Sequence, residues 1–303
     1  MTTGARGQAL SKNVGHTDGV ASSKSRLVWL SQGFFAIASA SVAIFSLAYG
    51  DFAPGVRSLP AWVPWRETCV YGSALVVLAA SAGICFSRTV SASVLAIGAY
   101  QAAWVIISAR PILSKPLSIG AWYGFCEALS ALVGAWILFE LLRRQSRGWP
   151  TPIASERALR PAQVLFGLTC IFYGSSHFAY AEYTAGMVPA WLPCRVGFAY
   201  FTGLCHVAAG IGIIFGILSR LAATLEATMM SLFGLLVWVP SFFAQPRPDW
   251  ATPAQNQWSE LVVTLVLAAS ASIVATSLGN RSWTFASRRL TEVAGTTGSR
   301  PIE

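Results

Sequence analysis

The sequence predicts an all-α integral membrane protein whose eight transmembrane helices form two tandem four-helix bundles in the same orientation. Hydrophobic residues make up 54% of the 303 positions and charged residues only 11%, whereas about a quarter of the residues in an ordinary soluble domain are charged. Successive apolar stretches of about 20 residues have the length that crosses a hydrocarbon core of about 30 Å as a helix. An internal repeat then groups these helices by four.

Short polar segments separate the predicted spans. Ser87, Arg88 and Thr89 mark the boundary between the second and third spans, and little more than Ser219 and Arg220 marks the boundary between the sixth and seventh. Both pairs are therefore predicted to be tight helical hairpins. The predicted spans are 27–49, 69–87, 90–109, 121–141, 163–180, 197–217, 220–243 and 257–279.

A polar stretch in the middle of the chain divides the spans into two blocks. The first 26 residues are polar and lack the short apolar core and small-residue cleavage site of a signal peptide. We therefore expect a disordered cytoplasmic tail over 1–26, a first four-helix unit over 27–142, a cytoplasmic linker over 143–162, a second unit over 163–280 and a cytoplasmic tail over 281–303.

Basic residues predict the orientation. Most of the 21 lysines and arginines fall in the segments that share a side with the N-terminus, and the positive-inside rule places such segments in the cytoplasm. Both termini are then cytoplasmic. The net charge of +9 is explained by this bias and by contact with anionic lipid, so the bilayer is the expected partner and nucleic acid is not.

The internal repeat rests on one string that occurs twice. Pro-Ala-Trp-x-Pro-x-Arg covers 60–66 and again 189–195. Other residues recur in the same order, such as Tyr71 as Tyr200 and Glu127 as Glu260. An even number of helices per unit keeps both copies in one orientation, related by an axis along the membrane normal.

The repeated unit resembles the DoxX family of small four-helix bacterial membrane proteins. The resemblance rests on Tyr173-Gly174 near the end of the fifth span, His177, the loop over 189–195, and His206 in a glycine-rich sixth span. It covers most of 163–279 and, more faintly, 27–141, so the first unit is a degenerate copy. It implies a protein of the bacterial inner membrane that belongs to a quinone-linked redox system, with a soluble or membrane oxidoreductase subunit as partner.

Ionisable residues inside the membrane mark the candidate ligand site. His206 is placed at about 13 Å depth by the helical rise, on a face with Gly203 and Gly210 that suits close packing. It is predicted to bind a ligand together with Tyr173, Arg195, His177 and Glu260, which converge in the outer half of the second unit. The position of His206 corresponds to Val77 in the first unit, so the site is expected in the second unit alone.

The remaining buried charges are interpreted as structural. We expect ion pairs between Arg66 and Glu127 and between Arg195 and Glu260. Glu226 has no partner in the sequence and stands about 9 Å from the cytoplasmic face by the helical rise. We expect its carboxylate to snorkel toward that face.

No sequence motif assigns a cofactor. The six cysteines form no Cys-x-x-Cys, and there is no metal, haem, iron–sulfur or flavin motif. His177 and His206 are expected to differ too much in depth to share a haem, and the outer positions of Cys69 and Cys194 allow a bridge between the units. Two functions stay open: quinone binding in a redox system, or a non-enzymatic scaffold, assembly subunit or small-molecule permease.

Overall fold

The computed structural model describes residues 4–52, 64–145, 152–245 and 253–283. Every regular element in these ranges is a helix, which confirms the all-α prediction. The elements are α1 Gly4–Tyr49, α2 Arg66–Gly83, α3 Val90–Ser114, α4 Ile119–Gln145, α5 Pro152–Ala179, α6 Ala181–Met187, α7 Arg195–Phe215, α8 Ser219–Phe233, the π-helical η2 Gly234–Trp238, α9 Val239–Ser241 and α10 Ala254–Ser277.

Within the described ranges, six helical segments have the length and apolarity to cross a membrane, as a multi-pass membrane protein requires. They are Arg26–Tyr49, Val90–Ser114, Ile119–Arg144, Arg195–Phe215, Ser219–Ser241 and Ala254–Ser277. The other two predicted spans look different. The helix α2 has only 18 residues and begins with charged Arg66 and Glu67, and the span predicted over 163–180 belongs to a bent pair of helices.

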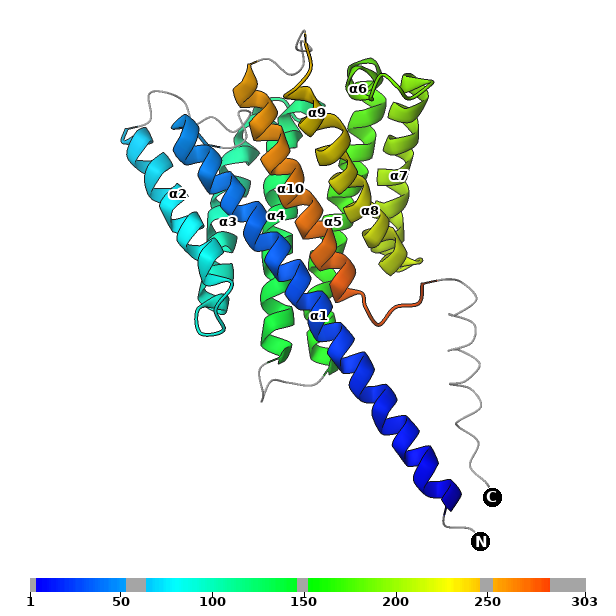
Figure 1. Ribbon diagram of the computed structural model, residues 1–303. Helices are drawn as coiled ribbons and strands as arrows, with labels where there is room; N and C mark the ends of the chain where they lie inside the picture. The colour runs from blue at the N-terminus through cyan, green and yellow to red at the C-terminus, as the bar shows by residue number, and fades with distance from the viewer. Residues whose placement is uncertain (1–3, 53–63, 146–151, 246–252, 284–303) are drawn as a thin grey trace.

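The bent pair is α5 and α6, which meet at an angle of 94°. The break lies at Tyr180, whose φ of −118° and ψ of 38° leave the helical region. Figure 1 shows α6 at the end of the molecule opposite to the start of α1. The span predicted over 163–180 ends at this break, where Tyr180, Glu182 and Tyr183 follow the apolar run.

A second irregularity lies in the span predicted over 220–243. There the α-helix α8 changes into the π-turn η2, and the chain returns to α-helical geometry in α9. Pro240 has no backbone N–H to complete the α-helical bond to the carbonyl one turn earlier, and a π-turn accommodates such a defect. The wider turn places Phe233 and Trp238 at its two ends.

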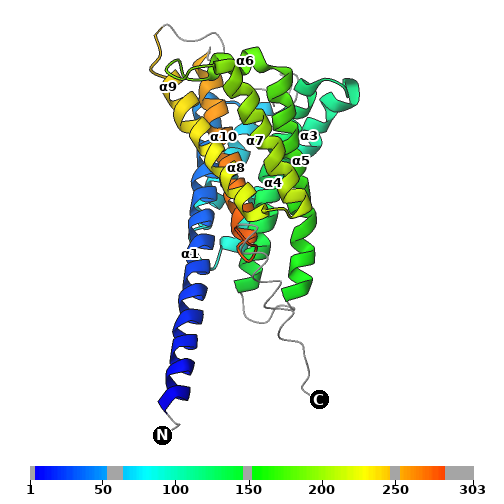
Figure 2. The same cartoon turned by 90° about the vertical axis from the view of Figure 1, so that its right-hand side faces the viewer.

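Two predicted irregular segments are helical. The helix α1 begins at Gly4, so the disordered tail predicted over 1–26 is helical from Gly4 onward. This segment contains no proline that would interrupt a helix. Figure 2 shows the extension projecting beyond the rest of the molecule. The linker expected over 143–162 is largely taken up by the end of α4 and the start of α5, and most of the tail over 281–303 lies outside the described residues.

The two predicted bundles are joined into one. Neighbouring helices pack in the order α1, α2, α3, α4, α5, α7, α8, α10, and α10 returns to α1. The helices α4 and α10 also pack on each other between the two halves, and Figure 1 shows them at the centre of the molecule. Close approach of α4 and α10 depends on Gly134, because a methyl group there would lie 2.5 Å from the Ser270 hydroxyl.

The buried positions of the two halves follow one pattern. Trp65 and Cys194, which precede the repeated arginine, both have left-handed backbones, with φ of 60° and 51°. Every buried residue of α2, and Ile84 just after it, lies 129 positions before a buried residue of α7. The residues of the first set are Val70, Ala74, Val77, Ala80, Ser81 and Ile84, and their counterparts are Ala199, Gly203, His206, Ala209, Gly210 and Ile213. This is the pattern that a tandem duplication predicts.

The helices α3 and α8 show the same correspondence at a spacing of 133 positions. The buried residues Val90, Ser93, Val94 and Ile97 of α3 precede Ala223, Glu226, Ala227 and Met230 of α8. By this register, Glu226 in the second unit occupies the place of Ser93 in the first.

Candidate functional site

A large cavity lies in the second unit. Its volume is about 1590 Å³, and residues of α5, α6, α7, α8, η2 and α10 line it, together with Gly120, Tyr123 and Glu127 of α4. Most of the lining side chains are apolar or aromatic, and a few polar groups converge among them. This combination is typical of a small-molecule site.

Two pairs of glycines bring α5 and α7 together beside the cavity. A methyl group at Gly174 would lie 2.5 Å from the carbonyl oxygen of Gly203, and one at Gly210 would lie 2.5 Å from that of Gly167. Small residues allow this close approach of helix backbones in membranes. The helix face predicted to carry His206 beside Gly203 and Gly210 is therefore the packed face.

The crossing places His177 and His206 side by side. Their ring centroids are 5.1 Å apart, with the rings inclined by 68°. The expectation that the two histidines differ in depth is wrong, because counting residues from the helix ends ignores where α5 and α7 cross. Rings in direct contact also leave no space for a haem plane between them.

His206 forms a buried pair with Glu226. Its Nδ1 lies 2.8 Å from Oε1 of Glu226, and the side chains are only 1% and 2% exposed. The expected snorkelling of Glu226 is therefore wrong: α8 turns this carboxylate inward, to a partner on α7. The other carboxylate oxygen, Oε2, is buried and accepts no hydrogen bond, and the thiol of Cys170 lies beside the carboxylate.

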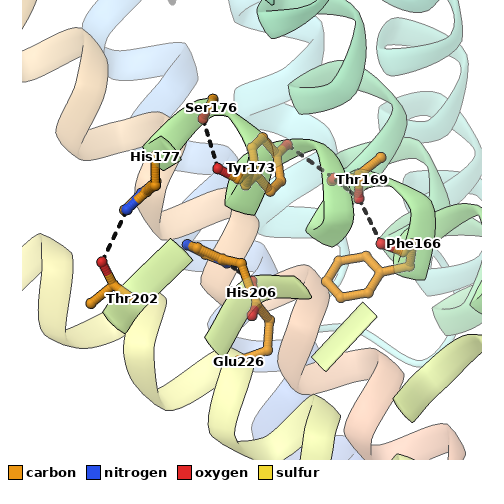
Figure 3. A network of polar contacts seen from close by, with 9 residues as sticks. Phe166, Thr169, Tyr173, Ser176, His177, Thr202, His206 and Glu226 are labelled. Carbon is orange, nitrogen blue, oxygen red and sulfur yellow. Dashed lines mark hydrogen bonds and ion pairs between the residues drawn. The ribbon is translucent and has the colours of Figure 1, made fainter. Parts of the chain in front are cut away.

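Aromatic rings surround the His206 imidazole. The ring centroids of Tyr173 and Phe233 lie 6.0 and 5.9 Å from that of His206. His177 stacks on Phe233 at 6.0 Å and uses its Nδ1 toward the Thr202 hydroxyl at 3.0 Å. Figure 3 shows Tyr173, His177, Thr202 and His206 grouped around the crossing of α5 and α7. Both histidines therefore have Nδ1 engaged, and each retains Nε2 for a ligand.

Tyr173 is held toward the centre of the molecule. Its hydroxyl lies 3.2 Å from that of Ser130 on α4, and Ser130 donates to Thr169 at 2.9 Å (Figure 3). These bonds join α4 to α5, so Tyr173 ties the cavity wall to the interface between the two units. It lines the same cavity as His206.

The structure brings together four of the five predicted ligand-binding residues. Tyr173, His177, His206 and Glu260 line one cavity. The fifth, Arg195, begins α7 with an exposed side chain and is not among the lining residues.

The predicted ion-pair residues have mixed positions. Arg66 pairs with Asp51, which was not among the predicted partners, and both side chains are partly exposed. Glu127 is buried and lines the cavity. The pairs of Arg66 with Glu127 and of Arg195 with Glu260 stay predictions.

Among the described residues, no group of three or more histidine, cysteine, aspartate or glutamate side chains could hold a metal ion. All six cysteines are free thiols. No protein family model, curated protein or solved structure matches the chain, so the resemblance to DoxX proteins rests on the motifs alone.

Sequence reasoning missed the role of Glu226. One signal was available: Glu226 and His206 are both ionisable groups within apolar helices joined by a tight hairpin, and such groups usually pair. The hairpin fixes that α7 and α8 are neighbours. It does not fix which faces of the two helices meet.

Proposed function

We propose that this chain is a DoxX-like protein of the bacterial inner membrane that binds a quinone in the cavity of its second unit, as the membrane component of a quinone-linked redox system. The observation that carries the proposal is the buried His206–Glu226 pair in the wall of a large, mostly apolar cavity. Ionisable pairs inside a membrane usually mark ligand or proton pathways.

The first unit argues against a purely structural role for this pair. By the register of buried residues, His206 corresponds to Val77 and Glu226 to Ser93, and both counterparts are buried. The same helix packing therefore forms without an ionisable pair. Because a buried pair adds little stability over apolar residues of similar volume, a scaffold alone gives no reason to keep it.

The proposed chemistry uses the free edge of His206. With Nδ1 engaged by Glu226, Nε2 donates a hydrogen bond to a quinone carbonyl and gives its proton when that oxygen is reduced. The isoprenoid or alkyl tail lies against the apolar lining. Two electrons come from the partner oxidoreductase subunit, the His206–Glu226 pair gives one proton, and a second proton taken up from the aqueous phase completes the quinol.

The test compares two double variants. His206→Val with Glu226→Ser copies the residues of the first unit into the second, and Val77→Ala with Ser93→Ala is the matched change in the first unit. Each protein is purified from bacterial membranes, and its quinone is extracted and quantified by chromatography. The proposal expects quinone in the wild type and the first-unit variant, and loss from the second-unit variant. Equal quinone in all three proteins would contradict it.

Orientation has its own test. We expect reporter fusions after Arg147 and after Glu303 to report a cytoplasmic position and fusions within 181–194 to report an external one. An external signal at Arg147 would contradict the proposed two-unit topology.

A further inference from the structure

The cavity is acidic in a basic chain. Its lining includes the carboxylates of Glu127, Glu226 and Glu260 and the imidazoles of His177 and His206, and none of its described lining residues is a lysine or arginine. The chain as a whole has a net charge of +9. An anionic ligand in this cavity would therefore meet like charge and no permanent cation.

The His206–Glu226 pair holds one exchangeable proton. With that proton the pair is neutral overall, either as carboxylic acid and imidazole or as carboxylate and imidazolium, and both arrangements present N–H at Nε2. Without it the pair carries one negative charge. A net charge so deeply buried is strongly disfavoured, whether the cavity is empty or occupied.

We infer that the cavity binds lipophilic organic cations in exchange for the proton of the His206–Glu226 pair. One cation enters, one proton leaves, and the charge inside the cavity stays the same. This goes beyond the proposed function, because it needs the cavity and the pair but not a quinone. A neutral ligand leaves the proton in place, and an anion has no compensating charge.

Two further features of the site favour a cation. Oε2 of Glu226 is buried and accepts no hydrogen bond from an N–H or O–H group. The weakly donating thiol of Cys170 lies beside the carboxylate, so the ionised carboxylate is incompletely compensated. The aromatic rings of Tyr173 and Phe233 near His206, with Tyr180 and Tyr183 further along the lining, offer the negative faces that attract delocalised cations.

Other ionisable groups face the same space. They are Tyr123 and Glu127 on α4, Tyr173 and His177 on α5, Tyr180 at the break, Tyr183 on α6, Cys205 on α7 and Glu260 on α10. The buried thiol of Cys170 on α5 lies beside the Glu226 carboxylate. Glu127 and Glu260 make further contacts of their own. Glu226 is assigned the exchange because its charge is coupled to an imidazole that lines the cavity.

Two probes of similar shape and opposite charge test the inference. Tetraphenylphosphonium and tetraphenylborate are titrated against the purified full-length protein in detergent, with the tryptophan fluorescence of the chain as the signal. We expect the wild type to bind the phosphonium, with affinity rising about tenfold per pH unit, since one proton is released per cation bound. Glu226→Gln, which keeps the shape of the side chain, should weaken binding at least tenfold and remove the pH dependence.

The borate is the control for partition into detergent, and it should give the same signal with wild type and variant. Thermal unfolding checks that Glu226→Gln is folded, and the double variant His206→Val, Glu226→Ser should lose phosphonium binding as well. Phosphonium binding that is independent of pH, or unchanged in folded Glu226→Gln, would overturn the inference. Quinone content is measured separately, so a protein that binds the cation but no quinone refutes the proposed function and leaves this inference standing.

Discussion

Removing one partner of the His206–Glu226 pair should destabilise the protein much more than removing both. In His206→Val, the Glu226 carboxylate stays 2% exposed and loses its bond of 2.8 Å. A stranded buried charge costs about 3–5 kcal/mol. The loss of unfolding free energy cannot exceed the cost of neutralising the Glu226 carboxylate with a proton, because protonating a solvated glutamate at pH 7 costs about 4 kcal/mol. The expected loss is therefore about 3–4 kcal/mol at pH 7.

This loss should depend on pH in a defined direction. Protonation of the stranded carboxyl becomes easier by about 1.4 kcal/mol for each unit by which the pH falls. The difference in unfolding free energy between wild type and His206→Val should therefore shrink between pH 7 and pH 5. The double variant His206→Val, Glu226→Ser strands no charge, so its stability should lie above that of His206→Val at pH 7.

The assay is reversible denaturation in detergent micelles, followed by far-ultraviolet circular dichroism, for the wild type, both single variants and the double variant. The double-mutant cycle should give a coupling of about 1–3 kcal/mol. If the losses of the two single variants simply add in the double variant, the two side chains do not act as a pair. That result would refute the explanation that each single substitution strands a buried charge.

Two further predictions concern the scaffold. Gly210→Ala should lower the free energy of unfolding by about 1–3 kcal/mol, because its methyl group would lie 2.5 Å from the Gly167 carbonyl oxygen. The control Gly72→Ala should cause no such loss, because a methyl group there meets nothing within 4 Å. Thermal unfolding of both variants in detergent checks this, and equal midpoints would contradict the close crossing of α5 and α7. Arg66→Ala should lower stability by no more than about 1 kcal/mol, since its pair with Asp51 is partly exposed, and a larger loss in the same assay would indicate a buried partner.

Composition and periodicity were sufficient to predict the class of the fold. An all-α membrane protein follows from apolar runs that are long enough to cross a bilayer, and the spacing of Arg66 from Arg195 predicted the common pattern of the two halves. The same reasoning placed His206 on a packed glycine face. These features depend on order along one helix, which a sequence displays directly.

Tertiary packing decided the site. Glu226 lies 20 positions from His206 on the next helix, and only the rotation of α8 relative to α7 turns it toward the imidazole. The depth of His177 relative to His206 depends on where α5 and α7 cross. The joining of the two units through α4 and α10 likewise depends on which faces fit together, as at Gly134 and Ser270. The sequence alone determined the all-α membrane class, because hydrophobicity is local, whereas side-chain contacts between helices decided which residues meet.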